Sequence, residues 1–458
     1  MRRPPARRTR SHGHRPPRRD SASEEAVSGQ PPEEFHVTAL GQAGDGLARP
    51  GNPADGGKAV FIPFALPGET VLARRTGNNR AELTEILTPS PDRITPVCGL
   101  YGTCGGCRMQ HLAPQHVAAW KRDIVLASLH GAGFTDLPDA RITTVPPATR
   151  RRADLALRRT ETGVLIGLHR RGGLPADLTE CHVLHSQIMQ LLPALRETCV
   201  RLDALGKSGD LLITLTDTGT DLLLSTDRPL TAPDRTRLAT LAANNGIARI
   251  SHRPAGQMTP PETAVQETPP VLAFGDGPPV RLPPGAFLQA SRDGENAIRT
   301  AILSALPPSP GRKAKITELY AGCGSFTFAL SGQARVEAWE GAAPAAEALR
   351  HAAGGLRIAV RQQDLNRQPV SGTDLSGTLA VVLDPPHMGA GAQMRLIAQA
   401  RPETVIYVSC NPQALSGDAR LLHAAGYTVS AIDVIDQFLW SAEVEAVIRF
   451  SAPRRRSH

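Results

Sequence analysis

The stretch ITELYAGCGSFTFAL, residues 316–330, decides the fold class of the C-terminal part of the chain. A short apolar run ends at a turn that contains Gly322 and Gly324, and a second apolar run follows the turn. The pattern predicts a strand, a glycine turn and a helix, and glycines at such a turn let a ligand approach the backbone closely. A third glycine in the register of dinucleotide-binding turns is absent, so the glycine pair by itself does not identify the ligand.

The same rhythm of strand, loop and helix continues to the end of the chain. Short apolar runs that end in small or acidic residues recur in ARVEAWEG, IAVRQQDL, LAVVLDPP, TVIYVSCNP and AVIRFS. This pattern predicts a doubly wound, Rossmann-like α/β domain over residues 286–458. Ligands of such sheets bind beyond the carboxyl ends of the strands, where these small and acidic residues lie.

Two carboxylates stand where a nucleotide-containing cofactor would need them. Glu340 closes the run AWEG, where it can hold both ribose hydroxyls, and Asp364 in QQDL is placed for an adenine amino group. The order of these residues after the glycine turn resembles class I S-adenosylmethionine (SAM) methyltransferases. Some other nucleotide-binding α/β domain remains the alternative at this point.

The stretch YVSCNP, residues 407–412, contains the strongest catalytic candidate. An isolated cysteine is most often a buried packing residue. Cys410 is expected at the end of a strand, at the carboxyl edge of the sheet, and the following Pro412 forces a turn, which together favour an active-site role. Glu445, in EVEAV at 443–447, is expected on or near the last strand.

Residues 34–92 predict a small β-barrel of the OB type. About five short apolar runs are separated by Gly and Pro turns and show no helical period. The segments GDGLARPG, VFIPFALPGE and SPDRITPVC resemble the TRAM domain of RNA-modifying enzymes. Barrels of this type often bind nucleic acid, although many are only structural.

Residues 93–285 predict an α+β central domain that carries a cysteine cluster. Cys98, Cys104 and Cys107 have the spacing of metal ligands, and Cys181 is the candidate for a fourth ligand. Four thiolates suit zinc or a [4Fe-4S] cluster, and the spacing does not separate the two.

The basic charge of the chain is concentrated at its N-terminus. Eight arginines and no acidic residue lie in residues 1–19, and removing these eight from the 51 Lys and Arg leaves 43 against 43 Asp and Glu. Residues 1–33 are therefore expected to be a disordered tail, either solubilising or a loose tether for RNA. Residues 150–171 hold seven more arginines in an expected β-hairpin, which favours a phosphate-contacting face over a merely solvated one.

The composition, with 41% hydrophobic and 21% charged residues, is typical of a globular protein, and 458 residues suffice for several domains. No run of about 18 apolar residues appears, so no membrane span is expected, and the N-terminus lacks the apolar core of a secretory signal. We therefore expect a cytoplasmic protein, in which clustered cysteines more often bind metal or act in catalysis than form disulfides.

Taken together, the motifs resemble the uracil-5 RNA methyltransferases that carry a TRAM domain and an iron–sulfur cluster, a group that includes bacterial 23S rRNA enzymes. The resemblance covers residues 34–450 and rests on the cysteine cluster together with FLQ, YAGCGSF, WEG, LDPP, VSCNP and VEAV. It implies that Cys410 is the nucleophile, that Glu445 is the general base, and that the four cysteines hold an iron–sulfur cluster rather than zinc. The contacts to SAM that it implies come from Gln289, Tyr320, Ser325, Glu340, Asp364 and Asp384.

The implied reaction is transfer of a methyl group from SAM to C5 of a uridine in RNA, through a covalent bond between Cys410 and C6 of the base. Addition of a thiolate makes C5 nucleophilic, and a carboxylate must later remove the C5 proton. The expected substrate is 23S rRNA, with tRNA as the alternative. Amino-group methylation of a base through the DPPH motif at 384–387 and RNA binding without catalysis are the competing hypotheses. The sequence indicates no obligate protein partner and does not reveal the oligomeric state.

Three positions depart from the family pattern. His387 stands where Arg is usual after Asp-Pro-Pro, Glu443 stands where His is usual before the general base, and Ser325 stands where Asn is common. These changes leave Cys410 and Glu445 in place. They make the identity of the substrate an open question, and a second carboxylate at position 443 is expected to raise the pKa of Glu445.

Overall fold

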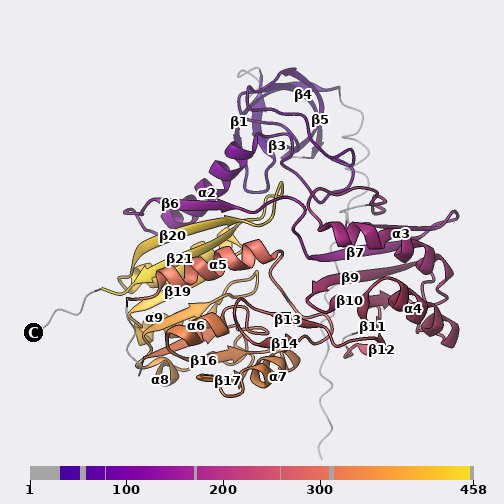
Figure 1. Ribbon diagram of the computed structural model, residues 1–458. Coiled ribbons are helices and arrows are strands. Elements are labelled where there is room, and N and C mark those ends of the chain that lie inside the picture. The colour runs from indigo at the N-terminus through magenta and orange to yellow at the C-terminus, as the bar shows by residue number, and fades with distance from the viewer. Residues whose placement is uncertain are drawn as a thin grey trace, which may run out of the picture. The chain divides into compact units, whose positions relative to one another are not determined.

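The computed structural model describes residues 31–51, 58–77, 79–169, 173–257, 259–308 and 314–453 (Figure 1). The chain divides into two compact units, Met1–Pro91 and Asp92–His458. The tail expected over residues 1–33 lies outside the described residues except for its last three, and Glu33 already begins the first strand. None of the described helices is long and apolar enough to cross a membrane.

The first unit is a closed five-stranded β-barrel. The strands are ordered β1-β2-β3-β5-β4, and the barrel closes because β4 pairs with both β1 and β5. The strands are β1 Glu33–Leu40, β2 Gly46–Pro50, β3 Val60–Ile62, β4 Thr70–Gly77 and β5 Arg80–Thr88. Phe35 and Val37 on β1 and Val71 and Ala73 on β4 point into the core, as the two-residue period of a strand requires. The structure thus confirms the expected barrel, and its relation to TRAM domains stays a prediction.

The second unit contains a six-stranded sheet with the order β12-β11-β10-β9-β7-β8. The elements of this region are β7 Arg152–Arg159, β8 Val164–Leu168, α3 Ser186–Arg201, β9 Ser208–Thr216, β10 Gly219–Thr226, α4 Ala232–Asn244, β11 Ile247–Pro254 and β12 Glu262–Gln266. β7 and β8 pair antiparallel, which confirms the hairpin expected in the arginine-rich segment. Leu155 and Leu157 on β7 pack in one core with Ile188 and Leu192 on α3. A separate two-stranded sheet follows, made of β13 Val271–Ala273 and β14 Pro279–Arg281.

An eight-stranded sheet with the order β17-β16-β15-β18-β19-β21-β20-β6 forms the rest of the second unit. Its elements are α2 Pro114–Gly131, β6 Ala140–Thr144, α5 Arg292–Ala305, β15 Lys315–Leu319, α6 Thr327–Gln333, β16 Arg335–Glu340, α7 Ala343–Ala352, β17 Ile358–Gln362, α8 Gly372–Leu375, β18 Ala380–Leu383, α9 Ala392–Ala400, β19 Thr404–Ser409, α10 Pro412–Ala424, β20 Thr428–Asp436 and β21 Glu445–Ser451. The strands from β17 to β19 are parallel, and β21 runs antiparallel between β19 and β20. This arrangement confirms the predicted Rossmann-like α/β domain.

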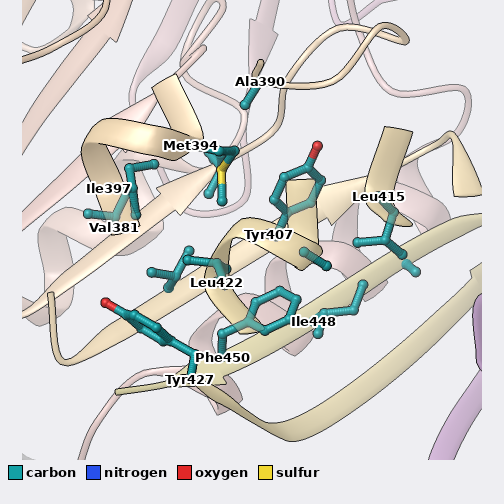
Figure 2. Close-up of a cluster of buried hydrophobic side chains, with 14 of the residues drawn as sticks. Val381, Ala390, Met394, Ile397, Tyr407, Leu415, Leu422, Tyr427, Ile448 and Phe450 are labelled. Carbon is teal, nitrogen blue, oxygen red and sulfur yellow. The ribbon is translucent and has the colours of Figure 1, made fainter. Parts of the chain in front are cut away.

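Helices cover both faces of the eight-stranded sheet, and the strand sequences explain why. Val381 and Tyr407 pack on one face with residues of α2, α9 and α10, whereas Val382 and Ile406 pack on the other face with residues of α5, α6 and α7. Figure 2 shows part of the first face, with Tyr407 lying among side chains of the neighbouring strands and helices. A strand that is buried on both faces is largely apolar along its length, as AVVL is throughout and TVIYVS is between Thr404 and Ser409.

Two elements from the segment expected to form the central domain join this sheet. β6 adds to its edge by pairing parallel with β20, and Val125 and Leu129 of α2 enter the same core as Val429 and Ile432 of β20. The reason is that β20 would otherwise be an exposed edge strand, and a helix and a strand from elsewhere in the chain cover it. The eight-stranded sheet therefore draws on residues far outside 286–458.

Candidate active site

The carboxyl ends of five neighbouring strands carry residues that the sequence singled out. Tyr320 follows β15, Glu340 ends β16, Asp364 lies beyond β17, Asp384 follows β18 and Cys410 follows β19. Because these strands run parallel, all five residues lie at the same edge of the sheet. The chain reverses its direction of strand addition between β15 and β18, and ligands of doubly wound sheets bind at such a switch point.

The glycine turn after β15 is held against the end of β16 by Glu340. The backbone N–H of Gly322 donates to Glu340 Oε2 at 2.8 Å, and the backbone N–H of Ala342 donates to Oε1 at 2.6 Å. Gly324 has a φ of +102°, and a Cβ at this position would lie 2.7 Å from Leu349 Cδ1. The turn thus requires glycine at 324 for both conformation and space.

Ser325 lies in the same turn. Asp364 lies in the loop that follows β17, where its Oδ1 accepts the backbone N–H of Asn366 at 3.0 Å. Burial, with smaller contributions from the carboxylates of Asp418 and Asp364, raises the pKa of Tyr320 to about 12. The Tyr320 hydroxyl is buried and finds no hydrogen-bond partner in the described part of the chain. A ligand in the crevice can satisfy it.

Two carboxylates are connected by two glutamine side chains. Gln289 Nε2 donates to Asp384 Oδ2 at 3.0 Å, and Gln437 Nε2 donates both to Gln289 Oε1 and to Glu445 Oε2, each at 2.9 Å. Gln289, Gln437 and Glu445 are buried, and Asp384 is partly buried. The structure therefore brings together three residues that the sequence placed far apart, Gln289, Asp384 and Glu445.

The two carboxylates hold protons more tightly than exposed ones. Burial raises the pKa of Asp384 to about 7, and burial followed by the charge of Asp384 raises the pKa of Glu445 well above its ordinary value. The N–H groups of Gln289 and Gln437 oppose these shifts because they stabilise the ionised carboxylates. Carboxyl groups with such raised pKa values can accept and release protons near neutral pH.

Cys410 lies within electrostatic reach of the same carboxylates. Burial, followed by the charges of Glu445 and Asp384, raises the pKa of its thiol to about 12. The next residue, Asn411, caps α10 by accepting the backbone N–H of Gln413 at 2.9 Å. Asn411 Nδ2 in turn donates to the His387 backbone oxygen at 2.8 Å, which ties the DPPH loop to the cysteine turn.

Glu443 does not have the effect expected from the sequence. The carboxylate that raises the pKa of Glu445 is Asp384, whereas the charge of Glu443 acts on Cys410 and on Lys121. The reason is the strand: Glu445 is buried on β21, while Glu443 lies in the exposed loop before it.

The four cysteines expected to bind metal gather in one region. The charges of Cys98, Cys104 and Cys181 act on Cys107, and burial, the largest cause, raises the pKa of Cys107 to about 12. Cys181 Sγ accepts the backbone N–H groups of Val183 and Leu184, each at 3.4 Å. No group of three or more His, Cys, Asp or Glu side chains in the described ranges is arranged to hold a metal ion.

Several arginines of the hairpin are engaged inside the protein rather than on a free face. Arg151 forms a buried ion pair with Glu295 at 2.7 Å. Arg159 donates to backbone oxygens at the end of α3, among them that of Leu202 at 2.9 Å. Arg152 lies over the exposed ring of Phe287, 5.7 Å from its centroid. The prediction of a phosphate-contacting face, which was based on the number of arginines in this segment, therefore counted side chains that are engaged within the protein.

Sequence reasoning missed three residues of this region, Gln437, Glu318 and Lys121. Gln437 follows β20 at the same edge of the sheet, and a polar residue directly after an apolar strand is a signal that could have found it. Glu318 is buried within β15, where burial raises its pKa to about 8. Lys121 is fully buried on α2, and Nζ donates to Asp436 Oδ1 at 2.5 Å.

Known proteins resemble this chain over most of its length. A family model described as tRNA (uracil-5-)-methyltransferase matches residues 345–452. A protein of Brucella melitensis described as an uncharacterized RNA methyltransferase is 37% identical over 416 residues, which cover 90% of this chain and 96% of that protein. A 23S rRNA (uracil(1939)-C(5))-methyltransferase of Alkalilimnicola ehrlichii is 31% identical over 440 residues, which cover 92% of this chain and 96% of that protein.

A solved structure extends the comparison to the fold. The crystal structure of the Pyrococcus abyssi tRNA (uracil-54, C5)-methyltransferase in complex with S-adenosyl-L-homocysteine has a TM-score of 0.67 with this chain. It is 18% identical, and the match covers 91% of this chain and 100% of that chain, so the two share a fold. From the near full-length similarity to these enzymes, the chain belongs to the RNA (uracil-5-)-methyltransferase family of SAM-dependent enzymes.

Proposed function

We propose that this protein methylates C5 of a uridine in 23S rRNA through a transient covalent bond between Cys410 Sγ and C6 of the base. The observation that supports this most directly is the grouping of Cys410, Asp384 and Glu445 at the carboxyl edge of one sheet. Glu445 Oε1 is buried and meets no hydrogen-bond partner in the part of the chain that the structure describes. This oxygen is free to take up a proton from a bound base.

Cys410 acts first in this proposal. Its thiolate adds to C6, the electron pair of the C5–C6 double bond moves into the ring carbonyl system, and C5 becomes nucleophilic. The thiol is protonated in the free protein because burial and the two carboxylates raise its pKa, so its proton must leave to solvent before the thiolate adds to C6. Bound SAM would supply the methyl group: C5 would form a bond to the methyl carbon while the bond from that carbon to the sulfonium sulfur breaks, and S-adenosyl-L-homocysteine would leave. The positive sulfonium would also favour a nearby thiolate.

Glu445 acts last. Its Oε1 takes the proton from C5, the electron pair of the C–H bond re-forms the C5–C6 double bond, and the thiolate leaves C6. A raised pKa makes this carboxylate a stronger base than an exposed glutamate. The net change is replacement of the C5 hydrogen by a methyl group, with the proton carried away by Glu445.

The residues at the edge of the sheet fit SAM in two groups. Glu340 and Asp364 follow neighbouring strands and suit the ribose hydroxyls and the adenine amino group, with Tyr320 and Ser325 beside the glycine turn. Gln289 and Asp384 instead lie next to Gln437 and Glu445, so we place them near the reacting atoms. Glu340 suits its role because two backbone N–H groups fix its carboxylate.

The proposed RNA is 23S rRNA because relatives that match nearly the whole chain at 31% and 32% identity are named 23S rRNA methyltransferases. Transfer RNA is the second candidate, since the matching family model is described for tRNA. Reacting the purified protein with unmodified 23S rRNA fragments and tRNA transcripts, followed by mass spectrometry of the nucleosides, distinguishes them. We expect 5-methyluridine in the rRNA fragment. Methylation of an exocyclic amino group would overturn the proposed chemistry.

The covalent step has its own test. RNA that carries 5-fluorouridine at the target has no C5 proton to remove, so the adduct should persist under denaturing electrophoresis. Wild-type protein should form this complex and the Cys410→Ala variant should not. A Cys410→Ala variant that forms the complex would exclude this nucleophile.

We also propose that Cys98, Cys104, Cys107 and Cys181 hold a [4Fe-4S] cluster, with zinc as the less favoured alternative. The donor set fits in its chemistry, because four thiols gather and Cys181 Sγ already accepts two backbone N–H groups, as cluster sulfurs do. The sulfurs would have to close around the metal, since their described positions do not form a cage. Iron and zinc analysis and the visible absorption spectrum of the purified protein distinguish the two metals.

A further inference from the structure

Gln437 is placed between the two carboxylates of the active site. Its single amide nitrogen uses both hydrogens, one toward Gln289 Oε1 and one toward Glu445 Oε2, each over 2.9 Å. Gln289 continues the chain of hydrogen bonds, because its own Nε2 donates to Asp384 Oδ2 at 3.0 Å. The three hydrogen bonds donated in this relay of Gln437 and Gln289 therefore lead to a carboxylate, directly or through the neighbouring amide.

The surroundings hold Gln437 in this position. The preceding residue, Asp436, accepts a hydrogen bond from the buried Lys121 Nζ, which also donates to the backbone oxygen of Phe438 at 2.9 Å. On the other side, α5 approaches so closely that a Cβ on Gly294 would lie 2.5 Å from Gln437 Oε1 and 2.8 Å from its Cβ. The side chain thus has little room to move away from Glu445.

The relay distinguishes the two oxygens of Glu445. Oε2 is occupied by the N–H of Gln437, whereas Oε1 is buried and without a partner among the described residues. A carboxylate whose orientation is fixed through one oxygen presents the other in a defined direction. Gln437 also stabilises the ionised form, which is the form that can accept a proton.

We propose that Gln437 is the positioning residue of the general base: it fixes Glu445 through Oε2, presents Oε1 to the C5 proton, and links Glu445 to Asp384 through Gln289. This inference rests on the proposed covalent mechanism. It assigns to residue 437 a role in the last step of the reaction, removal of the proton and release of the cysteine, and no role in binding RNA.

Other charged groups near Glu445 belong to the elements packed around it. Asp384 and Cys410 follow β18 and β19, Glu443 lies in the loop before β21, Lys121 faces Asp436 from α2, and Glu295 on α5 is neutralised by Arg151. A variant at 437 leaves all of these in place. A change in pH dependence can therefore be assigned to the lost N–H donors.

The test replaces Gln437 by leucine, which keeps the volume and removes both donors. We expect kcat to fall about tenfold with KM for RNA unchanged, because one charge-assisted hydrogen bond to the base is lost. The fall should be largest at acid pH and should recover as the pH rises, because loss of the Gln437 donors raises the pKa of Glu445 and its ionised form is then populated only at higher pH. Covalent enzyme–RNA complex should accumulate with ordinary uridine RNA, because the adduct forms but breaks down slowly.

Two further variants keep the test decisive. Gln393→Leu is the matched control: Gln393 is a fully buried amide on α9 that binds the backbone of Val370, away from the carboxylates, so its loss should lower stability without adduct accumulation or a changed pH profile. Gly294→Ala should reproduce the Gln437→Leu effect without altering Gln437 itself, because the new Cβ displaces the amide.

The outcomes separate this inference from the mechanism on which it rests. If wild-type protein traps 5-fluorouridine RNA through Cys410 but Gln437→Leu behaves like Gln393→Leu, the role of Gln437 is wrong and the mechanism stands. If wild-type protein forms no adduct, the mechanism fails first. A higher KM with unchanged kcat in Gln437→Leu would place the residue in RNA binding and would also overturn the inference.

Discussion

The active site and the cysteine region both bury several titratable side chains, yet they stabilise them differently. At the active site, Gln289 and Gln437 place N–H donors between Asp384 and Glu445. In the cysteine region, burial and the neighbouring sulfurs raise the pKa of Cys107, and backbone N–H groups reach Cys181. The comparison teaches that the carboxylates are arranged by the protein's own side chains, whereas four thiolates would need a cation to stay together.

The two regions are connected through the segment that precedes Glu445. The backbone N–H groups of Arg108 and Met109, directly after Cys107, both donate to the Trp440 oxygen at 2.6 and 2.9 Å. Arg150, beside the cysteines, lies over the ring of Phe438. The segment that leads to Glu445, the proposed general base, is thus held in part by the cysteine loop.

The largest expected effect is on methyl transfer and comes from a change in the active site. Cys410→Ala should lower methyl transfer by about 10⁴-fold or more, because no other group in the proposal can bond to C6. Methyl incorporation from labelled SAM into unmodified rRNA measures it. Cys199→Ala, which removes a buried thiol on α3 that belongs to another core, is the control and should keep its activity. Full product yield from Cys410→Ala would contradict the proposal.

The second prediction concerns the cysteine region. Cys107→Ser should lose bound iron and several kcal/mol of stability, because metal binding and folding are coupled in such sites. Metal analysis, the thermal midpoint and RNA affinity are the measurements. We expect impaired folding or RNA binding. Lost turnover with fold and affinity intact would instead indicate a catalytic cluster.

A third variant acts on the segment between the regions. Lys121→Met leaves Asp436 buried without its partner and should cost roughly 3–5 kcal/mol in the free energy of unfolding. Urea denaturation measures the loss. The double variant Lys121→Met, Asp436→Leu removes both charges and should regain part of the stability. An equal loss in both variants would show that the unpaired charge of Asp436 is not what destabilises the single variant.

The smallest expected effect concerns the raised pKa of Asp384. Because burial raises this pKa to about 7, the folded state favours the protonated carboxyl, so this group's contribution to stability is present below its unfolded pKa and is lost as the pH rises through about 7. Asp384→Asn should therefore stabilise the protein above neutral pH, because the amide carries no charge that burial disfavours. Below about pH 4 the gain should vanish. A gain that is equal at both pH values would refute the ionisation argument.

Local sequence patterns were enough to predict several features of the fold and of the candidate site. The glycine turn, the strand ends at Glu340 and Cys410, the barrel and the arginine-rich hairpin each follow from a short run of residues, because strand period, turn residues and apolar runs act over a few positions. The cysteine spacing likewise identified a cluster, and Glu445 was placed on the last strand.

The contacts between these residues depend on the tertiary structure and could not be predicted from local patterns. Gln437 and Gln289 are 148 positions apart in the chain and share one hydrogen bond, and no local period signals such a contact. Arg151 and Arg159 turned inward, and β6 joined a sheet that begins far along the chain, because buried polar groups and open sheet edges must be satisfied wherever a partner lies in space. The sequence specified the chemistry of each group, and packing selected its partners.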